Sequence, residues 1–322
     1  MSYKDRLYIN TPLLESHPLS KHAGITVYLK LENVQRSATF KIRGISHLCQ
    51  KALKEGAKHF VCSSGGNAGL AAAYSARKLG VPATIIVPES TPTFTVERLR
   101  GEGATVEVVG KVWDDSNQHT LKLAQQPGFV YIPPFDHPVI WEGHASLVEE
   151  IAETLQEKPG AIILSVGGGG LLCGVVAGLR KVGWADVPVV AMETKGADSF
   201  NAAVTAGKLV TIPDIASVAK CLGAKTVAQE AFNLSKQHPI HSVVVPDEEA
   251  VGACAKFLDD ERLLVEPACG AALAAIYSPV ISRLQDQGRL PEGVTSVVVI
   301  VCGGNNITLK QLETWKGQLG LT

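Results

Sequence analysis

One lysine has neighbours that raise the question of chemical reactivity. Lys41 lies between the aromatic Phe40 and the β-branched Ile42, in a segment that reads Ser-Ala-Thr-Phe-Lys-Ile-Arg-Gly from residue 37. A lysine amine can attack a carbonyl carbon to form a Schiff base, or it can act as a base. Most lysines are solvated surface residues, and this segment alone does not separate the two interpretations. The case for a reactive Lys41 depends on other segments.

A run of four glycines is the strongest local signal for a bound anion. The run consists of Gly167, Gly168, Gly169 and Gly170. It separates an expected buried strand at 161–166 from an apolar helix expected to begin at Leu171. Successive glycine N–H groups at a helix N-terminus suit a phosphate. The run lacks the endings and spacings of nucleoside-triphosphate and dinucleotide loops, so we expect a phosphate monoester. The alternative is a tight turn that uses glycine for packing.

A second anion site is indicated by residues 63–69, which read Ser-Ser-Gly-Gly-Asn-Ala-Gly. This segment lies between an expected strand at 58–63 and an expected helix at 70–79. Its hydroxyls, its glycine N–H groups and the helix N-terminus suit a carboxylate. Asn67 adds a side-chain amide that can bond to a ring hydroxyl. The alternative is that the serines only cap the helix.

Two further polar residues follow expected strands. Cys302 comes directly after the apolar run at 296–301, and Glu193 comes directly after the run at 187–192. Ligands of open α/β sheets bind at the carboxyl ends of strands. A thiol there can hydrogen-bond without carrying charge, or it can be a buried apolar cysteine. The carboxylate can be a ligand, a hydrogen-bond partner or a solvated loop residue.

Composition excludes several classes of function. The net charge is −1, which gives no electrostatic case for nucleic acid or for an anionic membrane surface. Apolar runs are far shorter than the ~20 residues that span a bilayer, and the N-terminal residues resemble no targeting signal. The nine histidines are dispersed, and the seven cysteines contain no C-x-x-C pair. We therefore expect a cytoplasmic protein with reduced thiols and with neither nucleic-acid nor membrane partners.

The elements that must position these residues alternate between strands and helices. Apolar runs of strand length alternate with helical patterns through most of the chain, which predicts an α/β fold built from parallel βαβ units. A break at Pro133-Pro134-Phe135-Asp136 suggests a domain crossing. We expect a large domain formed by residues 1–33 and 136–322, with residues 34–135 as a smaller inserted domain.

Together these features call for a phosphate monoester that carries a group reactive toward lysine. Pyridoxal phosphate meets both requirements, because its aldehyde forms a Schiff base with a lysine amine and its phosphate needs a glycine-rich cradle. The motifs around Lys41, Asn67, Gly167 and Cys302 also resemble, in the same order, those of the serine/threonine dehydratases of the tryptophan-synthase β (fold type II) group. This resemblance covers essentially the full chain.

The resemblance implies two open, twisted, mainly parallel sheets flanked by helices, with the cofactor between a large and a small domain, in a homodimer. It also implies a role for each matched residue. The implied cofactor-binding residues are Phe40, Lys41, Asn67, Gly167, Gly168, Gly169, Gly170, Leu171 and Cys302. The implied substrate-binding residues are Ser64, Gly65, Asn67, Ala68 and Phe135. The implied ligands of a monovalent cation, potassium in this family, are Gly167, Glu193, Ala197, Leu222 and Ala224.

The activity implied by the resemblance is that of an ammonia-lyase. L-Serine would give pyruvate and ammonia, and L-threonine would give 2-oxobutanoate and ammonia, in amino-acid breakdown and gluconeogenesis. Lys41 would hold the cofactor and then remove the Cα proton. The alternatives are threonine deamination as the main role, β-replacement as in cysteine synthases, and a catalytically weak, cofactor-binding homologue that acts through its dimer surface.

One departure from the related enzymes concerns Gly65. Serine racemases and many bacterial-type threonine deaminases carry Ser-Ser-Gly-Asn, whereas this chain has one more glycine before Asn67. Counting back from Asn67, the racemase serine falls on Gly65. Glycine at this position is typical of the serine dehydratase-like group, and alanine of the liver-type serine dehydratases. With no acid on this face of the substrate, we expect racemisation to be poor.

Overall fold

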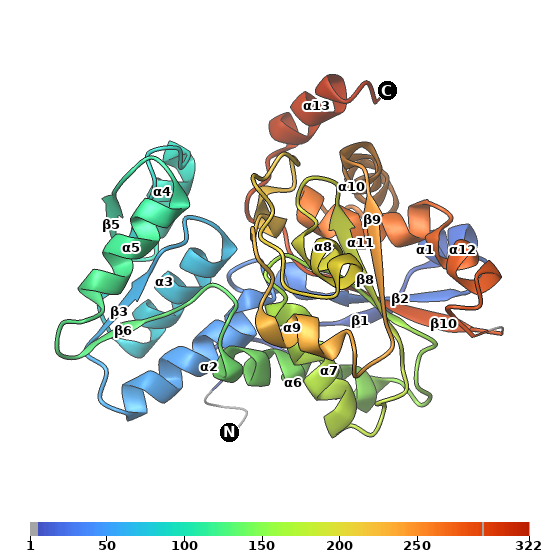
Figure 1. Cartoon of the computed structure of the whole chain (residues 1–322), viewed down its shortest axis with the longest axis horizontal. Helices are drawn as coiled ribbons and strands as arrows, with labels where there is room; N and C mark the ends of the chain where they lie inside the picture. Colours follow the sequence, from blue (N-terminus) through green and yellow to red (C-terminus); the bar gives the residue numbers. More distant parts are fainter. Residues whose placement is uncertain (1–5, 292, 322) are drawn as a thin grey trace. The chain divides into compact units, whose positions relative to one another are not determined.

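The computed structural model describes residues 6–291 and 293–321 (Figure 1). The chain folds into two units. Unit 1 comprises Gln35–His144 with the chain up to Ile9, and unit 2 comprises Asn10–Val34 with the chain from Ala145 onward. Each unit contains one sheet with helices, which confirms the α/β prediction.

Unit 1 is built on a four-stranded sheet in the order β5-β4-β3-β6, in which every pairing is parallel. Its strands are β3 (His59–Cys62), β4 (Ala83–Val87), β5 (Thr105–Val108) and β6 (Phe129–Tyr131). Its helices are α2 (Lys41–Lys54), α3 (Asn67–Leu79), α4 (Thr93–Gly101) and α5 (Trp113–Leu123). The fully buried strand β4 reads as a continuous apolar run, as expected for a parallel strand covered on both faces.

Unit 2 is built on a six-stranded sheet in the order β1-β2-β10-β7-β8-β9, in which only the β1–β2 pairing is antiparallel. Its strands are β1 (Leu13–Glu15), β2 (Thr26–Leu31), β7 (Ile162–Ser165), β8 (Val189–Thr194), β9 (Ile240–Val245) and β10 (Ser296–Val301). Because β2, β7, β8 and β10 run the same way, the segments that follow them emerge at one edge of the sheet.

The helices of unit 2 include two that the sequence patterns did not predict, α1 and α12. The helices are α1 (His17–Ala23), α7 (Gly170–Lys181), α8 (Ser199–Ala206), α9 (Gln229–Leu234), α10 (Asp247–Glu261), α11 (Pro267–Tyr277), α12 (Val280–Asp286) and α13 (Leu309–Gln318), with 3-10 turns at Glu32–Val34 and Lys220–Leu222. Both missed helices have only seven residues, too few for a helical period to be recognised. The three-residue strand β1 was missed for the same reason.

No helix in the described part of the chain combines the length and apolar character needed to cross a bilayer.

The division into units differs from the sequence-based boundaries near the N-terminus. The sequence analysis places residues 1–33 in the large domain, whereas the chain up to Ile9 belongs to unit 1. Two hydrogen bonds explain the difference. The Ile9 N–H donates to Gln35 Oε1 at 3.0 Å, and Gln35 Nε2 donates to the Ile9 carbonyl at 2.9 Å.

The second boundary falls within a helix, α6 (Pro138–Thr154), at His144 rather than at residue 135. The sequence pattern predicts a helix over 143–156, whereas α6 begins five residues earlier, with proline in its first turn, where the missing N–H costs nothing. A Cβ added to Gly44 of α2 would lie 2.4 Å from the Ile140 carbonyl oxygen. This close backbone approach attaches the first turns of α6 to unit 1.

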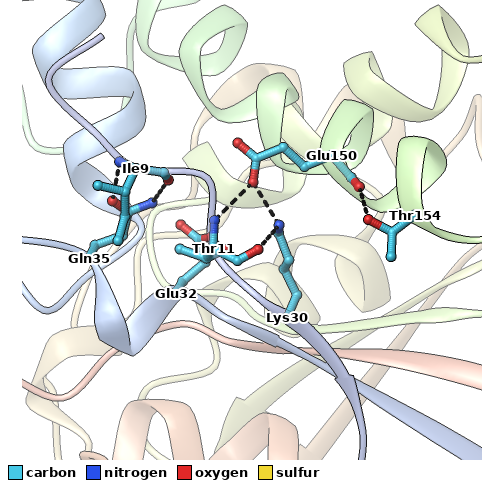
Figure 2. A network of polar contacts seen from close by, with 7 residues as sticks. All are labelled: Ile9, Thr11, Lys30, Glu32, Gln35, Glu150 and Thr154. Atoms are coloured by element: carbon cyan, nitrogen blue, oxygen red, sulfur yellow. Dashed lines mark hydrogen bonds and ion pairs between the residues drawn. The ribbon is translucent and has the colours of Figure 1, made fainter. Parts of the chain in front are cut away.

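A buried ion pair joins β2 to α6 within unit 2 (Figure 2). Lys30 Nζ donates to Glu150 Oε2 at 2.6 Å and to the Thr11 carbonyl at 2.8 Å. The Thr11 N–H also donates to Glu150 Oε2, at 3.3 Å. The Lys30 side chain is 1 % exposed and that of Glu150 is 7 % exposed. Removing one of two buried, paired charges is costly because the other remains in a medium of low dielectric constant.

We expect Lys30→Met to lower the free energy of unfolding by about 3–5 kcal/mol, because it leaves the Glu150 carboxylate buried without its ammonium partner. The double variant Lys30→Met/Glu150→Leu should recover most of that loss. Lys181→Met is the matched control, because Lys181 pairs with Glu149 at 2.7 Å on the surface, where a pair contributes about 1 kcal/mol or less. Urea denaturation measures all three, and equal losses for Lys30→Met and Lys181→Met would contradict the prediction.

Candidate active site

The candidate nucleophile lies at the first residue of α2. Lys41 Nζ donates to the Pro134 carbonyl at 2.8 Å and lies 5.4 Å from the centre of the Phe40 ring. Ala38 adopts a left-handed φ of +53°, although it is not glycine. Such a backbone costs roughly 1–2 kcal/mol, and residues of this kind cluster at functional sites. The segment therefore holds its lysine in a defined position beside residues 134–135.

A buried histidine near Lys41 was not identified from the sequence. The His144 ring lies 5.0 Å from the Phe40 ring, is 1 % exposed, and has an Nδ1 without a hydrogen-bond partner among the described residues. Burial, followed by the positive charges of Lys41 and Arg43, lowers the pKa of His144 well below its usual value. The imidazole is therefore neutral. His144 and Lys41 are far apart in the sequence, so no sequence pattern indicated that they lie near each other. The position of His144 depends on how α6 packs.

The segment expected to bind a carboxylate lies between β3 and α3. We call residues 63–66 the serine–glycine loop. Helix α3 begins at Asn67, one turn earlier than expected, so Asn67 and Ala68 belong to its first turn. No side chain of the described residues caps this helix, and its first N–H groups and dipole favour an anion. A Cβ on Gly69 would lie 1.7 Å from the Ser64 carbonyl oxygen, so glycine is required there.

The extra glycine of the loop faces a threonine. A Cβ on Gly65 would lie 2.9 Å from Thr91 Cγ2 and 3.2 Å from Val87 Cγ1. The space that a side chain at position 65 would occupy is therefore partly filled by the Thr91 methyl group. Neither Gly65 nor Thr91 carries an acid that could protonate a substrate carbon at neutral pH.

Phe135 is the remaining substrate-binding candidate. It directly follows Pro134, whose carbonyl accepts the hydrogen bond from Lys41. The Trp141 indole Nε1 donates to the Phe135 carbonyl at 2.8 Å. Unit 1 thus brings Lys41 and the segment at 134–135 together, although they are far apart in sequence. This contact was not predicted, because it depends on the end of β6 and the start of α6.

In unit 2, the glycine run lies between β7 and α7. Gly169 has a φ of +88°, and a Cβ on it would lie 2.5 Å from the Ala231 Cβ. A Cβ on Gly167 would lie 3.0 Å from the Leu222 Cα. The Gly168 carbonyl accepts from the Ala228 N–H at 3.0 Å. The run is therefore packed closely on one side, where no side chain fits.

The other features of this turn fit a phosphate. Helix α7 begins at Gly170, followed by the buried Leu171, and no described side chain caps its N-terminus. The Ser165 hydroxyl is buried and has no hydrogen-bond partner among the described residues. An oxyanion at the turn would accept from the helix N–H groups, and the Ser165 hydroxyl, at the end of β7, is an unused donor two residues before the glycine run. The glycine-rich turn therefore suits the phosphate of pyridoxal phosphate.

Cys302 follows β10 and is buried. A hydrogen bond with Cys269, then burial and the nearby negative charge of Glu266, raise the pKa of Cys302 well above its usual value. The thiol is therefore neutral, so that it can take part in a hydrogen bond without carrying charge. Glu266 Oε2 accepts from the Asn306 N–H at 3.2 Å, which fixes the loop after Cys302. All seven cysteines lie in the described part of the chain, and none forms a disulfide.

Glu193 lies within β8 and not after it, and it is fully buried. Its Oε1 accepts from the Phe200 N–H at 2.9 Å, and its Oε2 accepts from the Asn201 N–H at 2.8 Å. Burial raises the pKa of this carboxyl to about 8 despite these bonds. The carboxyl group thus accepts from two N–H groups at the start of α8, which is the hydrogen-bonding role among the three that the sequence left open.

The other expected cation ligands are partly assembled. Gly167 lies against Leu222, and the Leu222 carbonyl accepts from the Ala224 N–H at 2.8 Å. The Ala197 N–H donates to the Thr194 carbonyl at 2.8 Å. Within residues 6–291 and 293–321, no group of three His, Cys, Asp or Glu side chains is placed to hold a metal ion. Any cation here would rely mainly on backbone carbonyls.

Comparison with known proteins agrees with this chemistry. A family model described as "Pyridoxal-phosphate dependent enzyme" matches residues 4–303. The chain belongs to this family of pyridoxal-phosphate-dependent enzymes. Its fold is that of the fold type II members, as the sequence motifs predicted.

Several proteins similar to this pyridoxal-phosphate-dependent enzyme are named for activities on the hydroxy amino acids serine and threonine. The chain is 63% identical to human "L-serine dehydratase/L-threonine deaminase" over 317 residues, covering 98% of this chain and 97% of that one. It is 62% identical to human "Serine dehydratase-like", covering 98% and 96%. A crystal structure of a fungal L-serine ammonia-lyase from Rhizomucor miehei matches with a TM-score of 0.91 and 38% identity, covering 97% and 99%.

We expect Gly169→Ala to weaken cofactor binding by about tenfold or more. The added Cβ would displace the turn away from Ala231, and one charge-assisted hydrogen bond to a phosphate is worth roughly 1.5–3 kcal/mol. Gly183→Ala is the matched control. Gly183 also has a positive φ, +78°, but its Cβ would meet nothing within 4 Å, so only backbone strain of roughly 1–2 kcal/mol should result. Titration of each apoprotein with pyridoxal phosphate measures the difference, and equal affinities would contradict the assignment.

Proposed function

We propose that this chain is an ammonia-lyase that converts L-serine to pyruvate and ammonia, and L-threonine to 2-oxobutanoate and ammonia. The observation that carries the proposal is the 63% identity, over nearly the whole chain, to a human protein named for these two activities. The position of Lys41 and the glycine-rich turn at Gly169 support it, because they suit a cofactor that such a reaction requires.

We assign the cofactor to Lys41, Phe40 and Asn67 of unit 1 and to the glycine-rich turn, Leu171 and Cys302 of unit 2, which we regard as the small and the large domain. When bound, pyridoxal phosphate supplies an electron sink for the charge that develops at the substrate Cα. Lys41 would hold the cofactor through its side-chain amine. The neutral thiol of Cys302 would face the ring nitrogen without supplying a proton to it, which would favour elimination over transamination.

Lys41 then acts as the base. Its released amine accepts the Cα proton and becomes an ammonium ion. The Pro134 carbonyl, 2.8 Å from Nζ, is the acceptor that holds this ammonium in place. A fixed acceptor keeps the amine close to the reacting carbon, which raises the rate through proximity.

The substrate carboxylate is assigned to the serine–glycine loop and the first turn of α3, through Ser64, Gly65, Asn67 and Ala68, with Phe135 beside it. The uncapped helix N-terminus favours a negative charge. Because neither Gly65 nor Thr91 is an acid, the Cα would be reprotonated poorly on that face. The enzyme should therefore eliminate water and racemise little.

Release of pyruvate from L-serine tests the proposal. The parent enzyme should show the absorbance of lysine-bound cofactor and form pyruvate, with little D-serine and no cysteine when sulfide is offered. Lys41→Ala should lose both the absorbance and the turnover, because it removes the attachment point and the base together. Pyruvate formation by Lys41→Ala at the parent rate would reject the mechanism. A cysteine product would favour β-replacement, and cofactor absorbance without turnover would favour a binding protein. The ratio of the rates on L-serine and L-threonine assigns the main substrate.

We also propose that Glu193, with the carbonyls of Gly167, Ala197, Leu222 and Ala224, binds potassium. A cation would offset the cost of ionising this buried carboxyl, whose pKa burial raises to about 8. Replacing potassium chloride by tetramethylammonium chloride at equal ionic strength should lower the melting temperature of the parent. The same exchange should affect Glu193→Gln less. Equal melting temperatures of the parent in the two salts would reject the site.

The setting that we propose is a cytoplasmic homodimer in amino-acid breakdown and gluconeogenesis. The balanced net charge and the seven free cysteines fit this location, and the family resemblance supports the dimer. Light scattering of the purified enzyme measures the mass, and a monomer mass would reject the dimer.

A further inference from the structure

The serine–glycine loop is held by one face of helix α5, which the proposed mechanism does not use. The Trp113 indole Nε1 donates to the Ser63 carbonyl at 2.6 Å. Asn117 Oδ1 accepts from the Ser63 hydroxyl at 2.7 Å. Trp113 and Asn117 are four residues apart, so they lie on the same face of the helix. One helix face therefore contacts both the backbone and the side chain of Ser63.

A tyrosine completes this contact. The Tyr131 hydroxyl at the end of β6 donates to Asn117 Oδ1 at 2.8 Å and lies 3.5 Å from the Ser63 hydroxyl. Burial raises the pKa of Tyr131, so the phenol stays protonated and able to donate. Ser63 itself is fully buried. Asn117 thus receives two hydroxyl donors, one from the loop and one from the sheet.

The first turn of α5 is itself fixed. Asp115 Oδ2 accepts from the Lys111 N–H at 2.9 Å and from the Val112 N–H at 3.2 Å. Further along the helix, the Ser116 hydroxyl donates to the Val109 carbonyl at 2.8 Å. Trp113 therefore extends from a rigid support, although its own side chain is 43% exposed.

The peptide group between Ser63 and Ser64 is held through its carbonyl. Trp113 donates to this carbonyl, and because the peptide group is planar, the bond also fixes the orientation of the Ser64 nitrogen. Fixing this plane sets the direction in which the chain enters Gly65 and Gly66, the two residues with the greatest conformational freedom.

We propose that Trp113 and Asn117 are positioning residues that hold the serine–glycine loop ready for the substrate carboxylate. This inference rests on the proposed function, which assigns that loop to the carboxylate. Ordering a residue costs roughly 1–2 kcal/mol. A loop that is already ordered does not incur this cost when the substrate binds. Because the carboxylate is bound equally before and during the reaction, the effect falls on KM and leaves kcat nearly unchanged.

The variants Trp113→Phe and Asn117→Leu in the holoenzyme test the proposal. Trp113→Phe keeps an aromatic ring and removes the indole N–H, and Asn117→Leu keeps the size and removes the acceptor. Each should speed hydrogen exchange in peptides covering residues 63–66 by about tenfold and raise the KM for L-serine by about three- to tenfold, since a hydrogen bond contributes roughly 0.5–1.5 kcal/mol. The kcat and the cofactor absorbance should stay within about twofold of the parent.

Matched controls separate this role from a general loss of structure. Gln118→Leu makes the same kind of change at the next, exposed position of α5, and Trp315→Phe repeats the tryptophan change in α13. Neither should alter exchange in residues 63–66 or the KM. Ser63→Ala should reproduce Asn117→Leu, and combining the two should add little, because both remove the same bond. If Trp113→Phe does not fold, Tyr131→Phe removes one donor to Asn117 and serves in its place.

Each outcome decides one claim. Unchanged exchange in residues 63–66 for both Trp113→Phe and Asn117→Leu would overturn the positioning role, whatever the reaction. Faster exchange with an unchanged KM would overturn the link to the substrate. If the parent forms no pyruvate from L-serine, the proposed function fails, and the exchange experiment still decides whether α5 holds the loop.

Discussion

Parallel strand pairing is the constraint on which the candidate site depends. In unit 2, the parallel strands β2, β7, β8 and β10 bring the segments after them to one edge of the sheet. The glycine-rich turn and Cys302 are two of these segments. In unit 1, β3 and β6 are neighbours and parallel, so the serine–glycine loop and the segment at 134–135 also leave their sheet at one edge. Neither group would assemble if these strands paired in the antiparallel sense.

Glycines, which have no side chain, also shape the candidate site by allowing two close approaches of the backbone. Gly69 brings α3 against the Ser64 carbonyl, and Gly169 brings the phosphate turn against Ala231. In both places a Cβ would overlap a neighbouring atom, so the helix N-terminus would have to move. Glycine costs conformational entropy on folding, and the N–H groups that no side chain caps are stabilised further when an anion binds. The two turns therefore favour ligand binding over the stability of the empty protein.

Burial controls the charge of the remaining groups. Burial lowers the pKa of His144, which is therefore neutral beside Lys41. Burial also contributes to the raised pKa of Cys302, which is therefore neutral at the end of β10. The buried pair Lys30–Glu150 differs, because each charge has the other as a partner at 2.6 Å. It links β2, which leads toward Lys41, to helix α6.

The sequence by itself determined the fold class, the long strands and helices, and the motifs around Lys41, Asn67, Gly167 and Cys302. These follow from local periodicity and from residue types that few other roles require. Short elements such as α1 and β1 were missed, because they span fewer residues than a recognisable period.

Only the tertiary structure decided which residues support the motifs. Examples are the Pro134 carbonyl at Lys41, the helix-capping role of Glu193, and the contacts of Trp113 and Asn117 with Ser63. Each joins separate segments of the chain, only seven and eight residues apart for Glu193 but about 50 or more for the others, through hydrogen bonds that many polar residues could form. Residue type therefore gave no indication of the partner, and only the packing of helices and strands selected it.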